Sequence, residues 1–283
     1  GIGFVVRACP GLYCGDPFPP RLPPADFVRS TFRILPLHMA TLLYVFPHPD
    51  DESFGPAPAL ARQRREGHEV HLLTLTRGEA TSQRERLGVS KEEMGTIRFQ
   101  EMQNVARKLD LSSLRVLDLP DGELDTLDPR RLSQIIEEHV RRTAPDVMVT
   151  YPVHGVSGHP DHLVSHAVVK HLACSLRARG LPYPKRLAFF TLPPAEGTGR
   201  PDHLQASADE KIDCITTFLE NDLDTAQAAL HCYETYMPVI EEHQPLAEVE
   251  SGVAFEFFGE HHRPRLDDLT ADLPEIAWWD ESA

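Results

Sequence analysis

The tripeptide His-Pro-Asp occurs twice in this chain, and each copy is followed directly by another side chain that can bind a metal. The first copy starts at His48 and leads into Asp51, and the second starts at His159 and leads into His162. Each proline fixes its own backbone φ and restricts the residue before it, so both copies are expected to be stiff turns. The sequence thus carries two rigid turns that each present imidazole and carboxylate groups.

These side chains have the chemistry of a catalytic metal centre. Two histidines and one carboxylate are a common ligand set for zinc that leaves one coordination position open. The candidate ligands are His48, Asp51 and His162. Asp50 and Asp161 would remain for proton transfer or for supporting the ligands, and His159 as a proton donor. An isolated His-Pro-Asp is usually a polar turn with a capping aspartate, but two copies at strand-to-helix junctions favour the metal site.

Apolar strand patterns and amphipathic helix patterns alternate along the chain after Met39. The continuous apolar run over 41–46 predicts a strand that is buried on both faces. Further strands are predicted over 70–76, 114–119, 146–151, 186–192, 211–217 and 253–258, and helices over 58–66, 91–109, 129–142, 162–179 and 223–242. This order predicts a Rossmann-like α/β fold, a mostly parallel sheet flanked by helices, with a C-terminal strand and long helix as an extension.

Both turns fall where such a sheet binds ligands. The first turn follows the predicted strand 41–46, and the second follows the strand 146–151 after a glycine-containing loop over 154–158. In parallel α/β sheets, ligands bind beyond the carboxyl ends of the strands. We therefore expect the two turns to meet at one edge of the sheet and to face the same point.

The segment FPHPDDE over 46–52, taken with GHPDH over 158–162, resembles the LmbE-like superfamily related to N-acetylglucosaminyl-phosphatidylinositol de-N-acetylase (PIG-L). The resemblance extends over about 39–258 in the order of strands and helices, and the two motifs are its specific part. The Gly-Glu turn after the second predicted strand, Gly78-Glu79, is similar as well. That family is known for the zinc-dependent removal of acetyl groups from small molecules that contain N-acetylglucosamine.

The resemblance implies a role for each residue of the two turns. It implies that His48, Asp51 and His162 bind the metal, and the choice of Asp51 over Asp50 as a ligand comes from the family alone. It further implies that Asp50 is the general base, that His159 is the general acid and oxyanion donor, and that Asp161 holds the His159 ring. Some relatives have a tyrosine that assists the oxyanion two residues before that histidine, where this chain has Ser157.

Three further residues are predicted to contact a sugar substrate. They are Arg77, Glu79 and Arg98. The competing interpretation is that such arginines are solvated or pair with nearby carboxylates such as Glu101. The predicted reaction is hydrolysis of the N-acetyl amide to acetate and a free amine. The alternatives are a metal-dependent phosphoesterase and a non-catalytic sugar-binding protein, and iron(II) is an alternative to zinc because it accepts the same ligands.

Composition limits the partners. The 283 residues include 28 Lys and Arg against 43 Asp and Glu, a formal net charge of −15. This charge disfavours binding to nucleic acids or to anionic membranes, and the chain has no apolar run long enough to span a bilayer. The five cysteines form no CxxC pair, which is typical of reduced thiols in a cytoplasmic protein. The sequence leaves the aglycone and the oligomeric state open, although proteins of the resembled family often form homo-oligomeric rings.

Residues 1–38 differ from the rest of the chain. They contain seven prolines and show neither a helical nor a strand period. A proline density of this kind opposes regular packed structure, so we expect a poorly ordered extension. Residues 39–283 are expected to form a single LmbE-like deacetylase domain.

Overall fold

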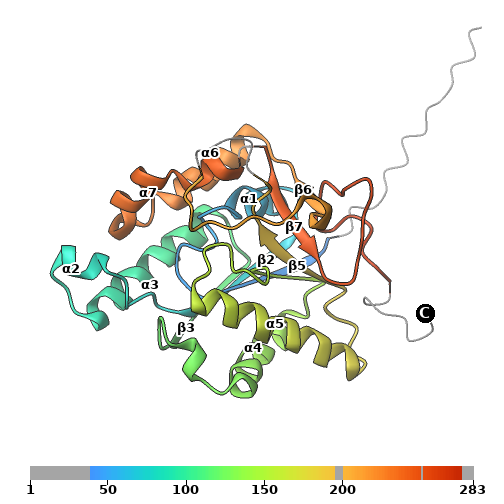
Figure 1. Cartoon of the computed structure of the whole chain (residues 1–283), viewed down its shortest axis with the longest axis horizontal. Helices are drawn as coiled ribbons and strands as arrows, with labels where there is room; N and C mark the ends of the chain where they lie inside the picture. Colours follow the sequence, from blue (N-terminus) through green and yellow to red (C-terminus); the bar gives the residue numbers. More distant parts are fainter. Residues whose placement is uncertain (1–38, 195–199, 250, 276–283) are drawn as a thin grey trace, which may run out of the picture. The chain divides into compact units, whose positions relative to one another are not determined.

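The computed structural model describes residues 39–194, 200–249 and 251–275, which form a seven-stranded sheet with helices on both faces (Figure 1). The predicted extension over 1–38 lies outside the described residues. The strands are β1 (Thr41–Phe46), β2 (Glu69–Thr76), β3 (Ser113–Leu119), β4 (Val147–Thr150), β5 (Arg186–Thr191), β6 (Cys214–Thr216) and β7 (Val253–Phe257). Their order is β3-β2-β1-β4-β5-β7-β6, and β7 runs antiparallel to both of its neighbours. The predicted mostly parallel α/β class is confirmed.

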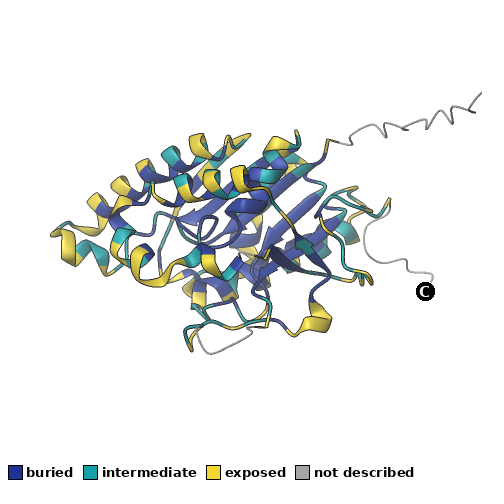
Figure 2. Cartoon of the chain, turned by 90° about the horizontal axis from the view of Figure 1, so that it is seen from above, coloured by how far each residue is buried: buried dark blue, intermediate teal, exposed yellow. Residues whose placement is uncertain are grey.

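Two apolar layers cover the sheet. Helices α1 (Ala57–Arg65), α3 (Lys91–Lys108) and α6 (Glu220–Leu230) pack on one face, and α4 (Pro129–Thr143) and α5 (Pro160–Ala178) pack on the other. Side chains of β1 alternate between the layers: Leu42 and Tyr44 belong to the first, Leu43 and Val45 to the second. Figure 2 shows the strands as a buried sheet between helices whose outer faces are exposed. The remaining elements are α2 (Gln83–Leu87), α7 (Met237–His243), η1 (Leu124–Thr126), η2 (Asp209–Lys211), η3 (Glu234–Tyr236) and η4 (Pro245–Val249).

The chain winds outward from β1 in both directions. After β1 it passes through α1 and α3 to β2 and β3, and it then returns through α4 to β4, which pairs with the other side of β1. Strand order therefore reverses between β1 and β4. In doubly wound sheets this switch point opens a crevice at the carboxyl ends of the strands, and the two His-Pro-Asp turns follow these two strands.

The predicted C-terminal extension needs two corrections. The single long helix over 223–242 is wrong, because α6 ends at Leu230 and α7 starts at Met237. Between them Tyr233 leaves the helical conformation and is fully buried, and Pro238 in the first turn of α7 lacks the N–H that a continuing helix would need. The predicted strand over 253–258 is β7, but it lies inside the sheet between β5 and β6 and is not an appendage.

Arg186 ties the C-terminal segment to the sheet. Its side chain on β5 is fully buried, its Nη2 lies 2.7 Å from Oε2 of Glu260, and its Nη1 donates to the carbonyl oxygens of Leu269 and Ala271. A buried charge whose partner is removed is strongly unfavourable. The segment that follows β7 therefore depends on one guanidinium.

We expect Arg186→Met to lower the free energy of unfolding by about 3–5 kcal/mol, because Glu260 and the two carbonyl groups lose their partner. Urea denaturation followed by circular dichroism measures this change. The matched control is Arg130→Met, since the Arg130 side chain is 85% exposed and forms its ion pair with Asp128, two residues earlier. Equal denaturation midpoints for the two variants would contradict the structural role of Arg186.

Candidate active site

The first turn is held in a conformation that few residues adopt. Asp50 has a φ of 87°, and its carbonyl oxygen accepts hydrogen bonds from the N–H groups of Ser53 (2.8 Å) and Phe54 (2.9 Å). Aspartate tolerates positive φ better than most residues. The N–H and hydroxyl of Thr76 on β2 both donate to the Pro47 carbonyl at 2.9 Å. The turn is thus fixed from the adjacent strand.

The second turn is the N-terminus of α5. His159 is the N-cap residue, and its Nδ1 accepts a hydrogen bond of 3.1 Å from the N–H of Asp161. Pro160 occupies the first helical position, where its missing N–H costs nothing. His162 lies in the first turn of the helix, and its Nδ1 is 2.8 Å from the Gly155 carbonyl oxygen. Ser157 places its hydroxyl 3.3 Å from the same nitrogen.

Atoms of the three candidate ligands lie close together between the turns, with a different oxygen of Asp51 toward each ring. Nδ1 of His48 lies 3.3 Å from Nε2 of His162 and 3.6 Å from Oδ2 of Asp51, and Nε2 of His162 lies 3.3 Å from Oδ1 of Asp51. A tetrahedral zinc with bonds of about 2.0–2.1 Å holds its ligand atoms about 3.3 Å apart. The spacing of these three groups therefore fits a metal of this size.

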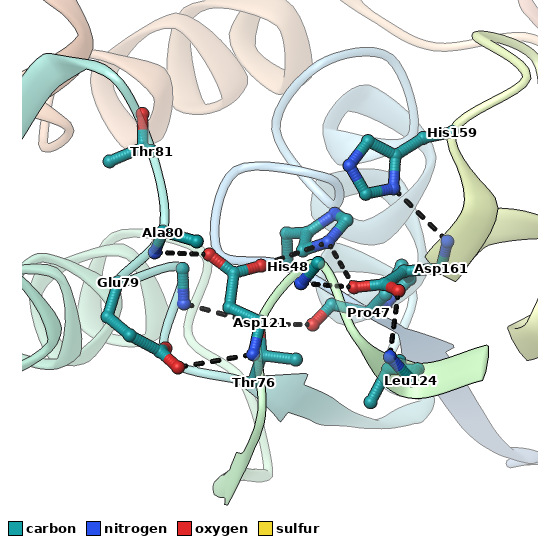
Figure 3. Close-up of polar contacts among 12 residues, drawn as sticks. Pro47, His48, Thr76, Glu79, Ala80, Thr81, Asp121, Leu124, His159 and Asp161 are labelled. Carbon is teal, nitrogen blue, oxygen red and sulfur yellow. Dashed lines mark hydrogen bonds and ion pairs between the residues drawn. The ribbon is translucent and has the colours of Figure 1, made fainter. Parts of the chain in front are cut away.

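The hydrogen bonds of the two rings also fit a cation. Nε2 of His48 is 3.1 Å from Oδ2 of Asp161, so it donates to that carboxylate (Figure 3). Nδ1 of His162 donates in the same way to the Gly155 carbonyl. Each neutral imidazole carries one proton, so the two nitrogens that face each other present lone pairs. Lone pairs 3.3 Å apart repel unless a cation or a proton lies between them.

Two groupings of the described residues bring three ligand atoms within 4.8 Å of one another, and neither includes Asp51. One is His48, His159 and His162, and the other is His48, Asp121 and Asp161. In the second, Oδ1 of Asp121 lies 3.3 Å from Nε2 of His48. Figure 3 shows this carboxylate between His48 and the N–H of Ala80, while Glu79 accepts a hydrogen bond from the N–H of Asp121. These carboxylates thus orient the outer nitrogen of His48.

Asp50 and Asp51 are both buried, but the pKa of Asp50 is raised and the pKa of Asp51 is lowered. Burial raises the pKa of Asp50 to about 6, against the lowering effect of the Arg98 guanidinium. Burial also acts to raise the pKa of Asp51, but His162 and His48 outweigh it and bring that pKa to about 2. Asp51 is therefore the better anionic ligand, and Asp50 the better proton acceptor near neutral pH.

The guanidinium of Arg98 binds the carboxylate of Asp50. Its side chain is fully buried on α3, and its Nη2 lies 2.5 Å from Oδ2 of Asp50 and 2.8 Å from the Pro49 carbonyl oxygen. The ring of Tyr236 lies 4.1 Å from its guanidinium carbon. The guanidinium therefore fixes one oxygen of the Asp50 carboxylate and stacks on an aromatic ring.

Three of the predicted site contacts need correction. The Asp161 carboxylate does not hold the His159 ring, because it accepts hydrogen bonds from Nε2 of His48 and from the N–H groups of Gly122 and Leu124. Only the backbone N–H of Asp161 bonds to His159, as the start of a helix requires. The predicted substrate residues Arg77 and Glu79 do not line the pocket described next, because Arg77 pairs with Asp118 and Glu79 holds the backbone of Asp121.

A pocket of about 430 Å³ opens over the two turns. His48, Asp50, Asp51, His159 and His162 line its inner end, together with Asp121 and the buried Arg98. Beyond them the wall is mostly apolar and comes largely from residues after β5. The size suits a ligand larger than acetate or phosphate.

Three tyrosines that the sequence did not indicate support the inner end of the pocket. The hydroxyl of Tyr151 donates to Oδ1 of Asp51 at 2.6 Å, and its ring stacks on His162 with centroids 4.0 Å apart. Tyr233 donates to the buried carboxylate of Glu52, and Tyr236 covers Arg98. The position of Tyr151 at the end of the fourth predicted strand was a usable signal. Tyr233 and Tyr236 gave none, because they lay inside a predicted helix.

Residues 43–173 match the family model described as PIG-L, GlcNAc-PI de-N-acetylase. Both His-Pro-Asp turns lie within the matched residues. This matched segment is similar to the PIG-L family, and we refer to it as the PIG-L domain. Within that domain β1 and β4 supply the two turns, and the switch point between them holds the three converging ligand atoms.

The PIG-L domain is also similar to curated deacetylases. The chain is 37% identical over 123 residues to a probable N-acetyl-alpha-D-glucosaminyl L-malate deacetylase 2 of Bacillus subtilis. This alignment covers 43% of this chain and 55% of that protein. It is 32% identical over 179 residues to a 1D-myo-inositol 2-acetamido-2-deoxy-alpha-D-glucopyranoside deacetylase of Kineococcus radiotolerans, covering 50% of each. The chain thus spans about half the length of the curated relatives it matches.

Solved structures share the fold over a longer stretch. An N,N'-diacetylchitobiose deacetylase from Pyrococcus horikoshii superimposes with a TM-score of 0.61 at 18% identity, over 78% of this chain and 84% of that one. A teicoplanin deacetylase superimposes with a TM-score of 0.56 at 13% identity, over 77% of this chain and 96% of that one. These likenesses concern the fold around the PIG-L domain. Among the described residues, no helix is both long and apolar enough to cross a bilayer.

Proposed function

We propose that this protein hydrolyses the N-acetyl group of a small molecule that contains N-acetylglucosamine, giving acetate and a free amine. The observation that carries the proposal is the convergence of His48, Asp51 and His162, with ligand atoms 3.3–3.6 Å apart, beside the buried carboxylate of Asp50. The PIG-L domain supports it, because relatives with this domain bear the names of deacetylases. Residues 39–283 would act as one domain, with Zn²⁺ as the cofactor.

The residues around the ligands divide the chemistry between them. A bound zinc would polarise the amide carbonyl and make water more acidic. Asp50 takes the proton of the attacking water, since its raised pKa suits a base that works near neutral pH. Arg98 keeps that carboxylate in place through Oδ2.

His159 serves the other end of the reacting amide. Its Nδ1 accepts from the backbone N–H of Asp161, so the neutral ring carries its proton on Nε2. Because His159 also lines the pocket, this N–H can donate a hydrogen bond to the oxyanion, while the proton that Asp50 has taken from water passes to the leaving nitrogen. Asp161 acts on His48 and keeps its Nδ1 free of a proton for the metal.

Release of acetate from a set of N-acetylglucosaminides tests the proposal. Zinc-reconstituted protein should release acetate, and the same preparation should release no phosphate from phosphomonoesters. Phosphate release without acetate would replace the proposal with a phosphoesterase. Binding of the glucosaminides by calorimetry without any turnover would indicate a sugar-binding protein.

Arg98 should act as a positioning residue for Asp50. We expect Arg98→Met to lower kcat for acetate release about 100-fold with little change in KM, because a misplaced base loses its attack geometry. Arg98→Lys should recover part of the loss by restoring the charge. Initial rates over a range of substrate concentrations separate kcat from KM.

Arg77→Met is the matched control for Arg98→Met. Arg77 pairs with Asp118, whose side chain is 74% exposed, and it does not line the pocket, so its kcat should stay close to that of the wild type. A raised KM with unchanged kcat in Arg98→Met would instead show that Arg98 contacts substrate directly.

A further inference from the structure

Apart from the residues of the two turns, the pocket lining includes a group of apolar side chains. Six side chains that are neither fully buried nor fully exposed form it, and we refer to them as the outer wall. They are Phe54, Pro201, Leu204, Tyr236, Val239 and Pro245. The rings of Phe54 and Tyr236 lie 6.4 Å apart, and the outer wall continues inward onto the buried side chains of Phe190 and Leu192. A ligand that fills the pocket therefore meets hydrocarbon beyond the catalytic groups.

The charges of the pocket oppose an anionic ligand. Among the described residues that line it, Arg98 is the single lysine or arginine, and its buried guanidinium is already bound to Asp50. The lining carboxylates are Asp50, Asp51, Asp121 and Glu248. Nε of Arg200 lies 2.7 Å from Oε2 of Glu248, which neutralises this carboxylate. Nη1 of Arg200 donates a hydrogen bond to the Pro193 carbonyl oxygen. The rim also holds His203 and His243.

The outer wall comes mainly from the part of the chain that the family model does not match. Five of its six residues follow residue 173, where that match ends, and Phe54 is the exception. The family match therefore does not identify the group that faces these five residues, and the malate and inositol groups are named for the relatives alone. The aglycone has to be inferred from the outer wall itself.

We propose that the pocket binds the N-acetylglucosaminyl group at its inner end and a neutral, apolar aglycone, aromatic or alkyl, against the outer wall. This inference rests on the proposed deacetylation and specifies its substrate class. Burial of an apolar aglycone stabilises the complex in proportion to the area removed from water. A carboxylate placed there would lose its hydration, and the described lining offers it no lysine or arginine other than Arg98, which is bound to Asp50.

Three α-glucosaminides test this inference: the phenyl, the myo-inositol and the L-malate N-acetyl-α-D-glucosaminides. We expect kcat/KM for acetate release to be highest for the phenyl compound and lowest for the malate compound, with at least about a 10-fold gap between them. All three assays use the same pH and ionic strength. Equal or faster release from the malate compound overturns the aglycone inference and leaves the deacetylase intact. No acetate from any of the three overturns both.

A charge introduced into the outer wall provides the second readout. Val239→Arg should lower kcat/KM for the phenyl compound and shift the phenyl-to-malate ratio toward malate by about 10-fold, because it supplies the missing cation. The matched control is Leu219→Arg, at a side chain that is 57% exposed and outside the pocket lining, which should keep the wild-type ratio. An unchanged ratio in Val239→Arg contradicts contact between the aglycone and the outer wall.

Discussion

We expect His162→Ala and Asp51→Ala proteins to lose their metal and to release acetate at least about 1,000-fold more slowly than the wild type, because Lewis-acid stabilisation is worth several kcal/mol. Each substitution removes one of three ligand atoms that lie 3.3–3.6 Å apart and leaves too few to hold a divalent ion. Asp51→Ala also removes the acceptor of the Tyr151 hydroxyl. Metal content by mass spectrometry and acetate release measure the two effects on the same preparations.

His166→Ala is the matched control for the ligand variants. His166 lies one helical turn after His162 on α5 and is buried, but its Nδ1 bonds to the carbonyl oxygen of Tyr151 and it does not line the pocket. The His166→Ala protein should therefore keep one metal per chain. Full metal content in His162→Ala would rule out the proposed ligand set and direct attention to His159, whose ring offers the alternative nitrogen.

We expect the second large effect from Asp50→Asn. In contrast to the ligand variants, this protein should keep its metal but lose turnover. The amide oxygen can still accept from Arg98, so the turn and the three ligands should keep their places and the metal should stay bound. The amide cannot take a proton from water, so we expect kcat to fall by about 100- to 10,000-fold. Zinc content and single-turnover acetate release report the two properties separately.

Asp121→Asn identifies which pocket carboxylate is the base. Asp121 also lines the pocket, but it contacts the outer nitrogen of His48 and the N–H of Ala80. Its loss should weaken metal binding moderately and spare the chemical step, because such supporting carboxylates tune affinity. Near-normal turnover in Asp50→Asn combined with a dead Asp121→Asn would reverse the two assignments.

The convergence of the two turns was predictable because it follows from connectivity. A strand, a stiff turn and a helix are each local features, and parallel strands bring their carboxyl ends to one edge whatever the details. The side chains of His48, Asp51 and His162 therefore lie close together, whereas the choice of Asp51 over Asp50 as a ligand came from the family resemblance alone. The fold was predictable on the same ground, since the apolar run of β1 and the alternation after it leave few topologies.

The contacts that tune the site were not predictable, because they depend on distances between elements far apart in the sequence. Arg98 reaches Asp50 from the middle of α3, and nothing in its neighbours distinguishes it from an arginine on a solvated helix face. Asp161 turns to His48 because the start of α5 aims its carboxylate across the crevice. Tyr233 interrupts a helical pattern because its hydroxyl has a buried partner, Glu52, which lies 181 residues earlier.

The most direct test of the account is the amount of acetate and of free amine formed from phenyl N-acetyl-α-D-glucosaminide by protein with a measured zinc content. The account predicts equal amounts of the two products from the wild type, and at most about one hundredth of that rate from Asp50→Asn at the same zinc content. Protein that holds one zinc per chain and forms neither product from this or the other glucosaminides would contradict the proposed function.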